Sequence, residues 1–317
     1  MASAVEVAAG RKAKTQAHQQ LEGKPAKKAA TAKAVKTPGK PAKNAKGPIT
    51  RDNTDKLWLY IWSVQCPEAE IDFVTDRFKK LTDRPLRRLR EDFCGAAATS
   101  AYFVQQHKEN VAIGVDLHKP TLSWGLKNLT KDFTPEQRER LILLNKNVLD
   151  AGPQAQGADA ILAMNFSYWI FQERETMLRY FRSVKQSLKP DGVLFMDIHG
   201  GYETTKEQQE PRWIKAPDGR RFRYIWDQHK FNPVTSQTQC YIHFEFEKGP
   251  AMHKAFNYTW RVWTVREIRE LLLEAGFKHA TFYGENEDEK GKGNGIYTAK
   301  TSYDADASFI AYLSAHG

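Results

Sequence analysis

The chain has 317 residues, of which 41% are hydrophobic, enough for one large domain or two ordinary ones with a real core. Its formal charge of +10 is unevenly spread: residues 1–48 hold 11 Lys+Arg and 2 Asp+Glu, a net +9, and the remaining 37 basic and 36 acidic residues leave +1. No run of 18 apolar residues occurs, which argues against a membrane-spanning helix.

Residues 1–48 consist mainly of Lys, Ala and Pro, with almost nothing large and apolar, which predicts a disordered basic tail. Two interpretations of this tail stay open. It is either a solvated, solubilising segment or a binder of nucleic-acid phosphates without sequence preference. Because it holds no aromatic residue that can stack on bases, we do not expect the tail to recognise a specific sequence.

The three cysteines, Cys66, Cys94 and Cys240, are widely spaced and form no CxxC or Cys/His pattern. This usage indicates a reducing compartment and argues against a structural zinc, so we expect no metal. Neither a secretory signal nor an Arg- and Ser-rich mitochondrial presequence is recognisable, and we therefore expect a cytoplasmic protein.

The folded body is predicted to span residues 49–317. It opens with the aromatic segment KLWLYIW at 56–62, followed by a helix that begins at Pro67. The apolar residues of that helix fall at helical spacing: Ile71, Val74, Phe78 and Leu81.

From residue 86 onward, short apolar runs alternate with helical patterns. The runs RRLREDF, VAIGVD, RLILLNKNV, DAILAMNF and GVLFMDI read as strands, and KHATFYGE and SFIAYLS as the last strands of the same sheet. Strands alternating with helices predict an α/β fold, here a Rossmann-like, doubly wound and mostly parallel sheet of about seven strands.

Residues 201–263 follow a different pattern. RRFRYIWDQHKF and QCYIHFEFEK alternate with period 2, which predicts an antiparallel β-hairpin inserted on the substrate side of the sheet. The following helix, in TVREIRELLLEAGF, begins with a capping box of Thr264 and Glu267 and ends near Gly276.

Polar residues stand at the ends of four predicted strands, where open parallel sheets bind their ligands. The first strand runs into EDFCGAA at 91–97, and Asp116 closes the second strand, 21 positions beyond Gly95. An acid at this distance from a glycine loop is placed to accept hydrogen bonds from ribose hydroxyls. Asp116 could instead cap the helix that opens at Pro120. The third strand is expected to end in Asn147 and Val148, and the fourth in residues 165–168.

At these residues the sequence resembles the class I S-adenosylmethionine-dependent methyltransferases, over about residues 57–317. LREDFCG, NFSYWIF and SVQCPE resemble more closely a bacterial branch of that family. The resemblance implies S-adenosylmethionine as cofactor, with Glu91 as the acid and Gly95 as the central glycine of the loop that holds its methionine part. It also implies ribose binding by Asp116, adenine between Asn147 and Val148, and a lining formed by the fourth-strand segment. The full set of expected cofactor residues is Glu91, Phe93, Cys94, Gly95, Ala97, Asp116, Leu117, Asn147, Val148, Asn165 and Phe166.

Two positions depart from the family's loop, because Phe93 and Ala97 stand where it has glycine. Backbone torsions with positive φ are therefore not expected at these two residues. Ala97 still permits close packing of the following helix. Phe93 is expected either to pack into the core or to wall the cofactor pocket.

The substrate side is predicted from aromatic and polar residues near the strand ends. Expected substrate contacts are Tyr60, Trp62, Gln65, Ser167, Tyr168, Trp226, Tyr258 and Trp260. Aromatic walls suit a sulfonium or an ammonium group, although alternating aromatics in a hairpin and Tyr168 also fit a packing role. His199, at the end of the fifth strand, is a candidate general base or a structural residue. NFSY shares its Asn and Tyr with the Asn/Asp-Pro-Pro-Tyr element of methyltransferases that act on amino groups, but lacks both prolines.

The sequence thus predicts methyl transfer, to a small molecule in the first place, with no metal and no covalent intermediate. Two alternatives remain: a nucleic-acid or protein methyltransferase held near its partner by the basic tail, and a non-catalytic protein that binds S-adenosylmethionine. The acceptor, the methylated atom and the oligomeric state are left open.

Overall fold

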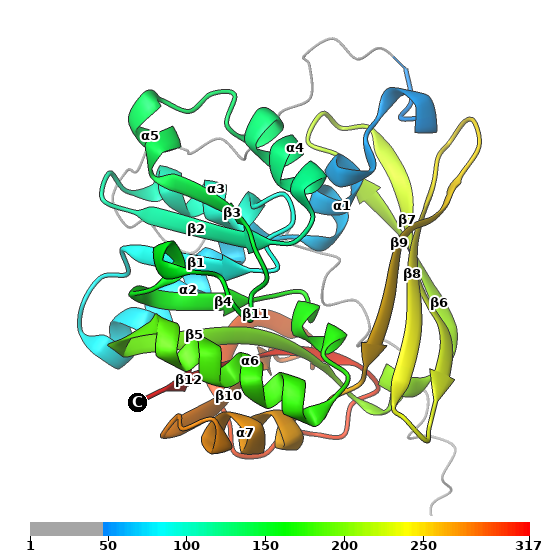
Figure 1. Ribbon diagram of the computed structural model, residues 1–317. Helices are drawn as coiled ribbons and strands as arrows, with labels where there is room; N and C mark the ends of the chain where they lie inside the picture. The colour runs from blue at the N-terminus through cyan, green and yellow to red at the C-terminus, as the bar shows by residue number, and fades with distance from the viewer. Residues whose placement is uncertain (1–46) are drawn as a thin grey trace, which may run out of the picture.

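The computed structural model describes residues 47–317 and contains two β-sheets (Figure 1). The predicted basic tail lies, up to residue 46, outside the described residues. The eight strands of the larger sheet are β1 (Arg88–Asp92), β2 (Val111–Asp116), β3 (Leu141–Asn145), β4 (Ala158–Ala163), β5 (Leu188–Gly200), β10 (His279–Glu287), β11 (Gly293–Ala299) and β12 (Phe309–His316). Their order is β11-β10-β12-β5-β4-β1-β2-β3.

The first five strands of this sheet are parallel, and β12 lies antiparallel between β5 and β10. The strand order reverses at β1, which pairs with β2 on one side and β4 on the other. This reversal is the point where open α/β sheets bind ligands. The prediction of a doubly wound, mostly parallel sheet is confirmed. The strand missed by the sequence is β11, whose segment GNGIYTA carries three exposed residues in its first four and lacks an apolar run.

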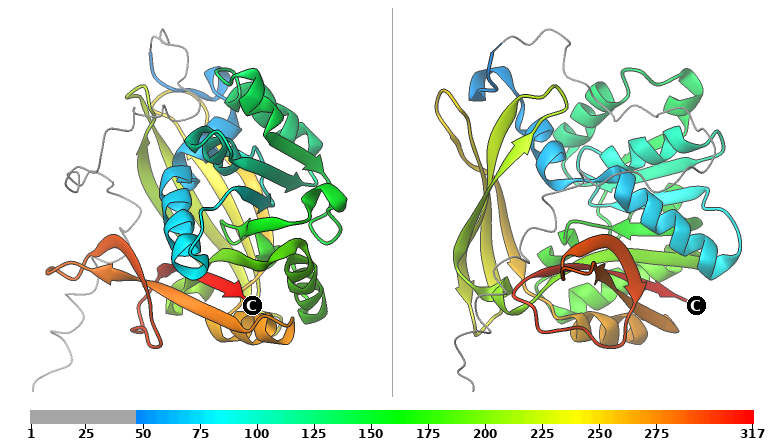
Figure 2. Two further views of the ribbon diagram at one scale, coloured as in Figure 1. Left: turned by 90° about the vertical axis from the view of Figure 1, so that its left-hand side faces the viewer. Right: turned by 180° about the vertical axis from the view of Figure 1, so that it is seen from behind.

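Helices cover both faces of the larger sheet, as the views of Figures 1 and 2 show. The helices are α1 (Lys56–Val64), α2 (Pro67–Thr82), α3 (Ala98–Gln106), α4 (Lys119–Leu129), α5 (Pro135–Glu139), α6 (Arg174–Ser187) and α7 (Val265–Glu274). Short 3₁₀ turns are η2 (Arg51–Asn53), η3 (Pro153–Ala155), η4 (Ser167–Ile170) and η5 (Tyr202–Thr205). The predicted helix at Pro67 and the capping box of Thr264 and Glu267 are both present. Among these helices none is long and apolar enough to cross a bilayer.

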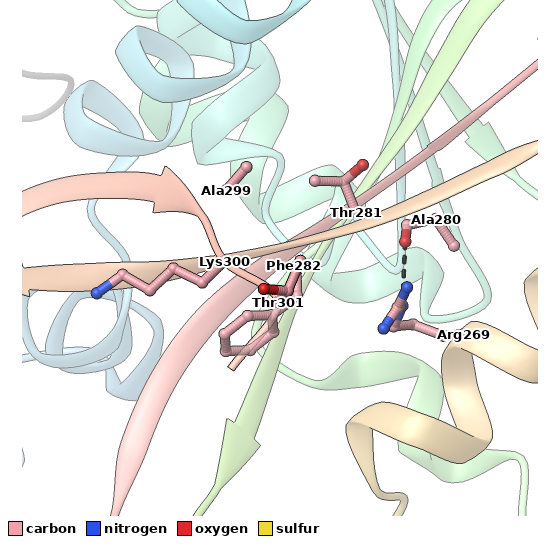
Figure 3. Close-up of a pocket in the computed structure, with 7 residues that line it drawn as sticks. All are labelled: Arg269, Ala280, Thr281, Phe282, Ala299, Lys300 and Thr301. Carbon is pink, nitrogen blue, oxygen red and sulfur yellow. Dashed lines mark hydrogen bonds between the residues drawn. The ribbon is translucent and has the colours of Figure 1, made fainter. Parts of the chain in front are cut away.

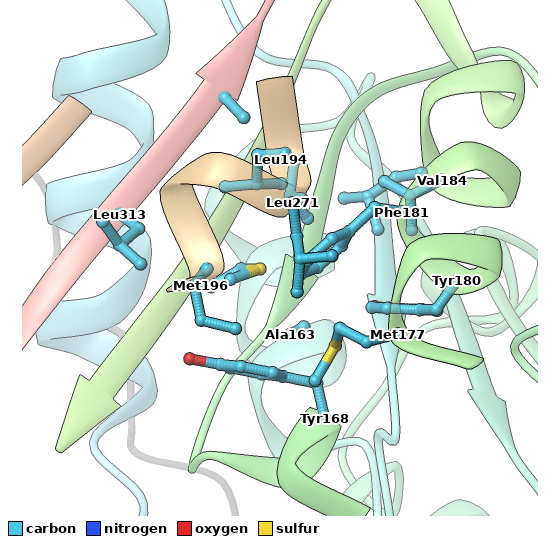
Figure 4. Close-up of a cluster of buried hydrophobic side chains, with 14 of the residues drawn as sticks. Ala163, Tyr168, Met177, Tyr180, Phe181, Val184, Leu194, Met196, Leu271 and Leu313 are labelled. Atoms are coloured by element: carbon cyan, nitrogen blue, oxygen red, sulfur yellow. The ribbon is translucent and has the colours of Figure 1, made fainter. Parts of the chain in front are cut away.

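Each face of the sheet has its own hydrophobic core. On the α6 and α7 side, fully buried side chains of α6 pack onto β4, β5 and β12, among them Phe181 and Val184 (Figure 4). On the other side, Val74 and Phe78 of α2 meet Phe103 of α3. Burying one such side chain contributes about 1.5–3 kcal/mol, so these two layers fix the sheet that positions the strand ends.

The region predicted as an inserted hairpin is a separate antiparallel sheet of four strands. These are β6 (Gln208–Lys215), β7 (Arg221–Asn232), β8 (Gln237–Glu245) and β9 (Met252–Arg261), in that order. The predicted hairpin corresponds to β7 and β8. Its apolar face, which includes Phe222, Tyr224 and Phe244, packs on α1, which lies between the two sheets (Figure 1). KLWLYIW is therefore the helix that joins the sheets.

Candidate active site

The loop after β1 has the backbone shape of a three-glycine loop although it holds one glycine. Phe93, Gly95 and Ala97 all have positive φ, at 56°, 53° and 60°. The expectation that Phe93 and Ala97 avoid this region is wrong. Tertiary packing compensates for the torsional cost: the Phe93 ring lies 5.8 Å from that of Phe171, and Ala97 is buried beside Cys94. The side chains of Phe93, Cys94 and Ala97 thus serve the core, which leaves the loop backbone free to contact a ligand.

Two glycines, Gly95 in the loop and Gly125 in α4, determine how closely other atoms can approach the loop backbone. A Cβ at Gly125 of α4 would lie 2.1 Å from the carbonyl oxygen of Ala96, so only glycine allows α4 to pack this closely. A Cβ at Gly95 would meet only Thr121, at 3.9 Å. The space in front of Gly95 is therefore open, while the back of the loop is tightly packed.

Asp116 meets the loop, as the 21-residue spacing predicts. Its Oδ2 accepts a hydrogen bond from the Gly95 amide at 2.8 Å, and its Oδ1 accepts one from the His118 amide at 2.7 Å. Each carboxylate oxygen retains capacity for a second donor. The alternative role for Asp116 is wrong, because the N-cap of α4 is His118, whose side chain accepts from the Thr121 amide. Leu117 is 69% exposed beside it.

The third strand ends earlier than predicted, at Asn145. Asn145 pairs with Asp116 and donates its Nδ2 to the carbonyl oxygens of Asp116 and Leu117, at 3.1 and 2.8 Å. Asn147 is exposed and lies in the loop that follows, where its Oδ1 accepts from the Leu149 amide. Asn145 is a residue that sequence reasoning missed.

A buried ion pair between Arg90 and Asp92 holds the backbone at Val148 in place. Arg90, which is fully buried, bonds Asp92 at 2.7 Å and donates to the Val148 carbonyl oxygen at 3.2 Å. Asp92 also accepts from the Tyr180 hydroxyl at 3.0 Å. The expected adenine-side loop is thereby tied to the central strand.

Glu91 is buried below the loop and holds the start of α3. Its Oε2 accepts from the Ser100 amide at 2.8 Å and from the Ser100 hydroxyl at 2.5 Å. Burial raises the pKa of Glu91 to about 8, despite these two hydrogen bonds. Nearby Glu70 is also buried, accepts from the Thr99 hydroxyl at 2.9 Å, and has a pKa raised by burial.

Asp197 of β5 holds the turn after β4 and was missed by sequence reasoning. Its two oxygens accept from the amides of Asn165 and Phe166, at 2.8 and 2.9 Å, and both residues have positive φ. Its carbonyl oxygen accepts from the Tyr168 hydroxyl at 2.8 Å. Burial raises the pKa of Asp197 to about 7. An acid near the end of the apolar run GVLFMDI was the available signal.

Tyr168 lies inside the core that Figure 4 shows, with its side chain fully buried. This burial fits the packing role that the sequence left open for Tyr168. Ser167 bonds the Met164 carbonyl oxygen through its hydroxyl at 2.9 Å.

His199 lies beside this turn at the end of β5. Its Nε2 is 2.9 Å from the Ser308 hydroxyl, and its ring stacks at 5.7 Å on Phe166. Burial lowers the pKa of His199 to about 4, so the imidazole is neutral at pH 7. The lowered pKa makes this imidazole a weak base, and the Ser308 contact orients its ring.

The structure brings the three expected aromatics of the smaller sheet together. The ring of Trp226 lies 6.1 Å from that of Tyr258 and 6.0 Å from that of Trp260, and Tyr258 and Trp260 are 4.5 Å apart. Trp260 also lies 6.5 Å from Phe166. The rings of Trp226, Tyr258 and Trp260 thus form an aromatic wall, and Phe166 connects this wall to the end of β4.

The expected contacts from α1 face the smaller sheet. The ring of Tyr60 lies 4.8 Å from that of Phe256, and that of Trp62 lies 6.4 Å from that of Phe222. Gln65 ends the helix, and its Oε1 is buried without a hydrogen-bond partner among the described residues. Trp62 packs between α1 and the smaller sheet. Of the three expected contacts from this segment, Gln65 has the buried polar atom without a partner.

A pocket of about 430 Å³ lies elsewhere, against α7 and β10 (Figure 3). Arg269 in its wall bonds the Ala280 carbonyl oxygen at 3.0 Å, and Lys300 points away from Arg269. Polar groups do not converge there, and Ala280 is level with Leu194 of β5, well short of His199. The strand ends are the better candidate site.

No family model matches the chain. Curated relatives include a protein of Escherichia coli described as UPF0301 protein YqgE, 28% identical over 130 residues, which cover 37% of this chain and 70% of that protein. That description names no activity.

Solved structures share the fold over most of the chain. An S-adenosylmethionine-dependent methyltransferase from Clostridium acetobutylicum has a TM-score of 0.59 at 15% identity, covering 83% of this chain and 98% of that one. DesVI of Streptomyces venezuelae has a TM-score of 0.61 at 15% identity, covering 83% and 99%. CalS10 of Micromonospora echinaspora, described as an amino pentose methyltransferase and solved with SAM bound, has a TM-score of 0.59 at 13% identity, covering 86% and 99%. At these identities the likeness shows the Rossmann-like methyltransferase fold.

Proposed function

We propose that this chain transfers a methyl group from S-adenosylmethionine to a small-molecule acceptor. The observation that carries the proposal is the meeting of Asp116 with the left-handed loop at Gly95, at the point where the strand order reverses. Similar folds are described as S-adenosylmethionine-dependent methyltransferases.

The residues at the strand ends fit this cofactor in shape and charge. Space is open in front of Gly95, and Asp116 has hydrogen-bonding capacity left for ribose hydroxyls. Glu70, Glu91 and Asp197 are buried, and no ion pair joins them to a basic side chain within residues 47–317. Burial raises the pKa of all three acids, and a cation bound nearby would favour their charged forms. Both the sulfonium and the amino group of S-adenosylmethionine are cationic.

Each part of the site has a proposed task. Asp116 binds the ribose, the backbone of residues 93–97 holds the methionine part, and Asn147 and Val148 flank the adenine. Asn165 and Phe166 line the site beside the reacting centre. When bound, S-adenosylmethionine supplies a methyl group on a sulfonium sulfur, which a nucleophile's lone pair can take without a covalent enzyme intermediate.

The chain's own contribution is alignment and exclusion of water. The rings of Phe166, Trp226, Tyr258 and Trp260 shield the acceptor. Neutral His199, oriented by Ser308, lines the end of β5, and its lowered pKa suits it to hydrogen bonding with the acceptor better than to holding a released proton. A small acceptor is favoured because the smaller sheet and α1 lie beside the strand ends (Figure 1), and because Trp226, Tyr258 and Trp260 pack together next to Phe166.

The test is calorimetry of S-adenosylmethionine binding to Asp116→Ala and to the isosteric Asp116→Asn. Losing two charge-assisted hydrogen bonds, at about 1.5–3 kcal/mol each, should weaken binding by roughly 100-fold or more in Asp116→Ala. Circular dichroism should show an intact fold. Unchanged affinity in both variants would refute the proposal.

The acceptor class needs a separate measurement, because binding alone does not distinguish an enzyme from a non-catalytic binder. Cofactor labelled in its methyl group, incubated with the full chain and fractionated cell lysate, should place label in small metabolites. Label in RNA, DNA or protein would instead support the alternative in which residues 1–48 hold the enzyme near its partner.

A further inference from the structure

The inner face of the smaller sheet carries one carboxylate beside the aromatic wall. Along β6, residues alternate between half-buried and exposed, which places Glu210 on the same face as Ile214, a residue packed against α1 and the sheet. Glu210 pairs directly with Trp226 of β7. Side chains paired in this way have Cβ atoms about 4.5–5.5 Å apart, so Glu210 and Trp226 are cross-strand neighbours on this face.

This wall is continuous with the proposed reaction site. Phe166, at the end of β4, lies 6.5 Å from Trp260, which lies 6.0 Å from Trp226, measured between ring centroids. The Trp226 indole N–H donates to Gln228, whose amide in turn bonds the carbonyl oxygens of Glu203 and Lys206 in and after η5. The wall and Glu210 are thus held in fixed positions relative to the end of β5.

The cations nearest to Glu210 are already engaged elsewhere. Lys206 bonds Glu203 at 2.7 Å. Arg212 donates to the Ser63 carbonyl oxygen and lies over the Tyr224 ring, at 4.5 Å. The hydrogen bond found for the Glu210 carboxyl within residues 47–317 comes from Gln208, at 3.3 Å, and no ion pair joins Glu210 to a basic side chain there.

On the outer face of the same sheet, acidic side chains are paired with basic ones or with histidine. Glu245 bonds Arg223 at 3.0 Å, Glu247 bonds Arg221 at 2.5 Å, and Asp227 lies 3.1 Å from a His243 nitrogen. Each acid there has a partner that can carry positive charge. Glu210 is half-buried and forms no ion pair at contact distance within residues 47–317. Burial and the charge of Glu203 raise its pKa, and the more distant charges of Arg212 and Lys206 offset this only in part.

We propose that the acceptor carries a positively charged amine and that Glu210 is the specificity-determining residue that pairs with it. A carboxylate beside aromatic faces attracts an ammonium ion through charge pairing and cation–π contact at once. This inference rests on the proposed methyl transfer, and it names the charge of the acceptor that the same site selects.

The first test measures binding without turnover. Tryptophan fluorescence follows titration of the full chain with benzylamine and with the similarly shaped neutral benzyl alcohol. We expect benzylamine to bind at least tenfold more tightly, and this preference to vanish in Glu210→Gln. The control Glu245→Gln, which changes an acid on the outer face, should keep it. Equal or absent binding of the two probes to the unaltered chain overturns the proposal.

The second test uses turnover. The labelled product from lysate should contain an amine, and Glu210→Gln should raise KM for its precursor at least tenfold, with kcat changed less. A labelled product without an amine, or an unchanged KM in Glu210→Gln, overturns the proposal. Calorimetry separates this failure from failure of the proposed function, because Glu210→Gln should bind S-adenosylmethionine like the unaltered chain.

Discussion

Two turns at the same edge of the sheet reach left-handed backbone conformations by different means. The turn after β1 does so at Phe93, Gly95 and Ala97, and the turn after β4 at Asn165 and Phe166. In the β4 turn, Asp197 accepts both backbone amides directly. In the β1 turn, Asp116 bonds only Gly95, Glu91 bonds Ser100 one turn further on, and side-chain packing holds Phe93 and Ala97.

The difference shows that glycine is one of several ways to obtain such a turn. A non-glycine residue in this region costs about 1–2 kcal/mol. A buried carboxylate that accepts two amides offsets that cost by hydrogen bonding, and a buried aromatic ring offsets it by packing. The two turns should therefore respond differently to substitution.

The largest expected effect tests the acid beneath the β1 turn through pH. The folded-state pKa of Glu91 is about 8, so the folded chain keeps a proton that the unfolded chain releases near pH 4.5. The free energy of unfolding should fall as pH rises from 5 to 8, by up to about 1.4 kcal/mol per pH unit from this group. Glu91→Gln keeps an acceptor for Ser100 and should make the profile less steep, while Glu70 and Asp197, whose pKa values burial also raises, maintain part of the slope. Urea denaturation at each pH measures it, and equal slopes would contradict the assignment.

The next effect tests the β4 turn. Asp197→Asn replaces one acceptor oxygen by an amide donor that faces a backbone N–H, which should lower the free energy of unfolding by about 2 kcal/mol. Urea denaturation at pH 8 gives the value. The matched control is Asp191→Asn, whose exposed bond to Arg84 should cost less than about 1 kcal/mol. If both variants lost the same stability, Asp197 would not be the clamp of this turn.

The smallest effect concerns the strain left in the β1 turn. Ala97→Gly should raise the free energy of unfolding by up to about 1 kcal/mol, because glycine adopts positive φ without the Cβ penalty. Ala98→Gly, one residue further on in the first turn of α3, should lower it by about 0.5–1 kcal/mol. Thermal denaturation compares the two, and a loss in both would show that packing of the Ala97 methyl group outweighs the strain.

Some elements of the fold could be predicted from the sequence pattern, and others could not. The apolar runs of β2, β4 and β5, the 21-residue spacing from Gly95 to Asp116 and the capping box at Thr264 could be predicted because each is local or periodic. β6 and β11 were missed because their apolar residues are few and interrupted. β9 was missed although Phe256, Tyr258 and Trp260 alternate with period 2. Asn145 and Asp197 were missed as site residues because each acts on a backbone that is distant in the chain.

The sequence by itself determined the alternation of strands and helices, and with it the parallel sheet whose strand ends gather Glu91, Gly95, Asp116 and Asn165. Only the tertiary structure decided the backbone of the β1 turn, where φ is positive at Phe93 and Ala97 against their intrinsic preference. It also decided that Tyr168 packs inside while Glu210 faces Trp226. The physical reason is the same in each case: local preferences amount to about 1–2 kcal/mol, which a few buried contacts from other elements outweigh.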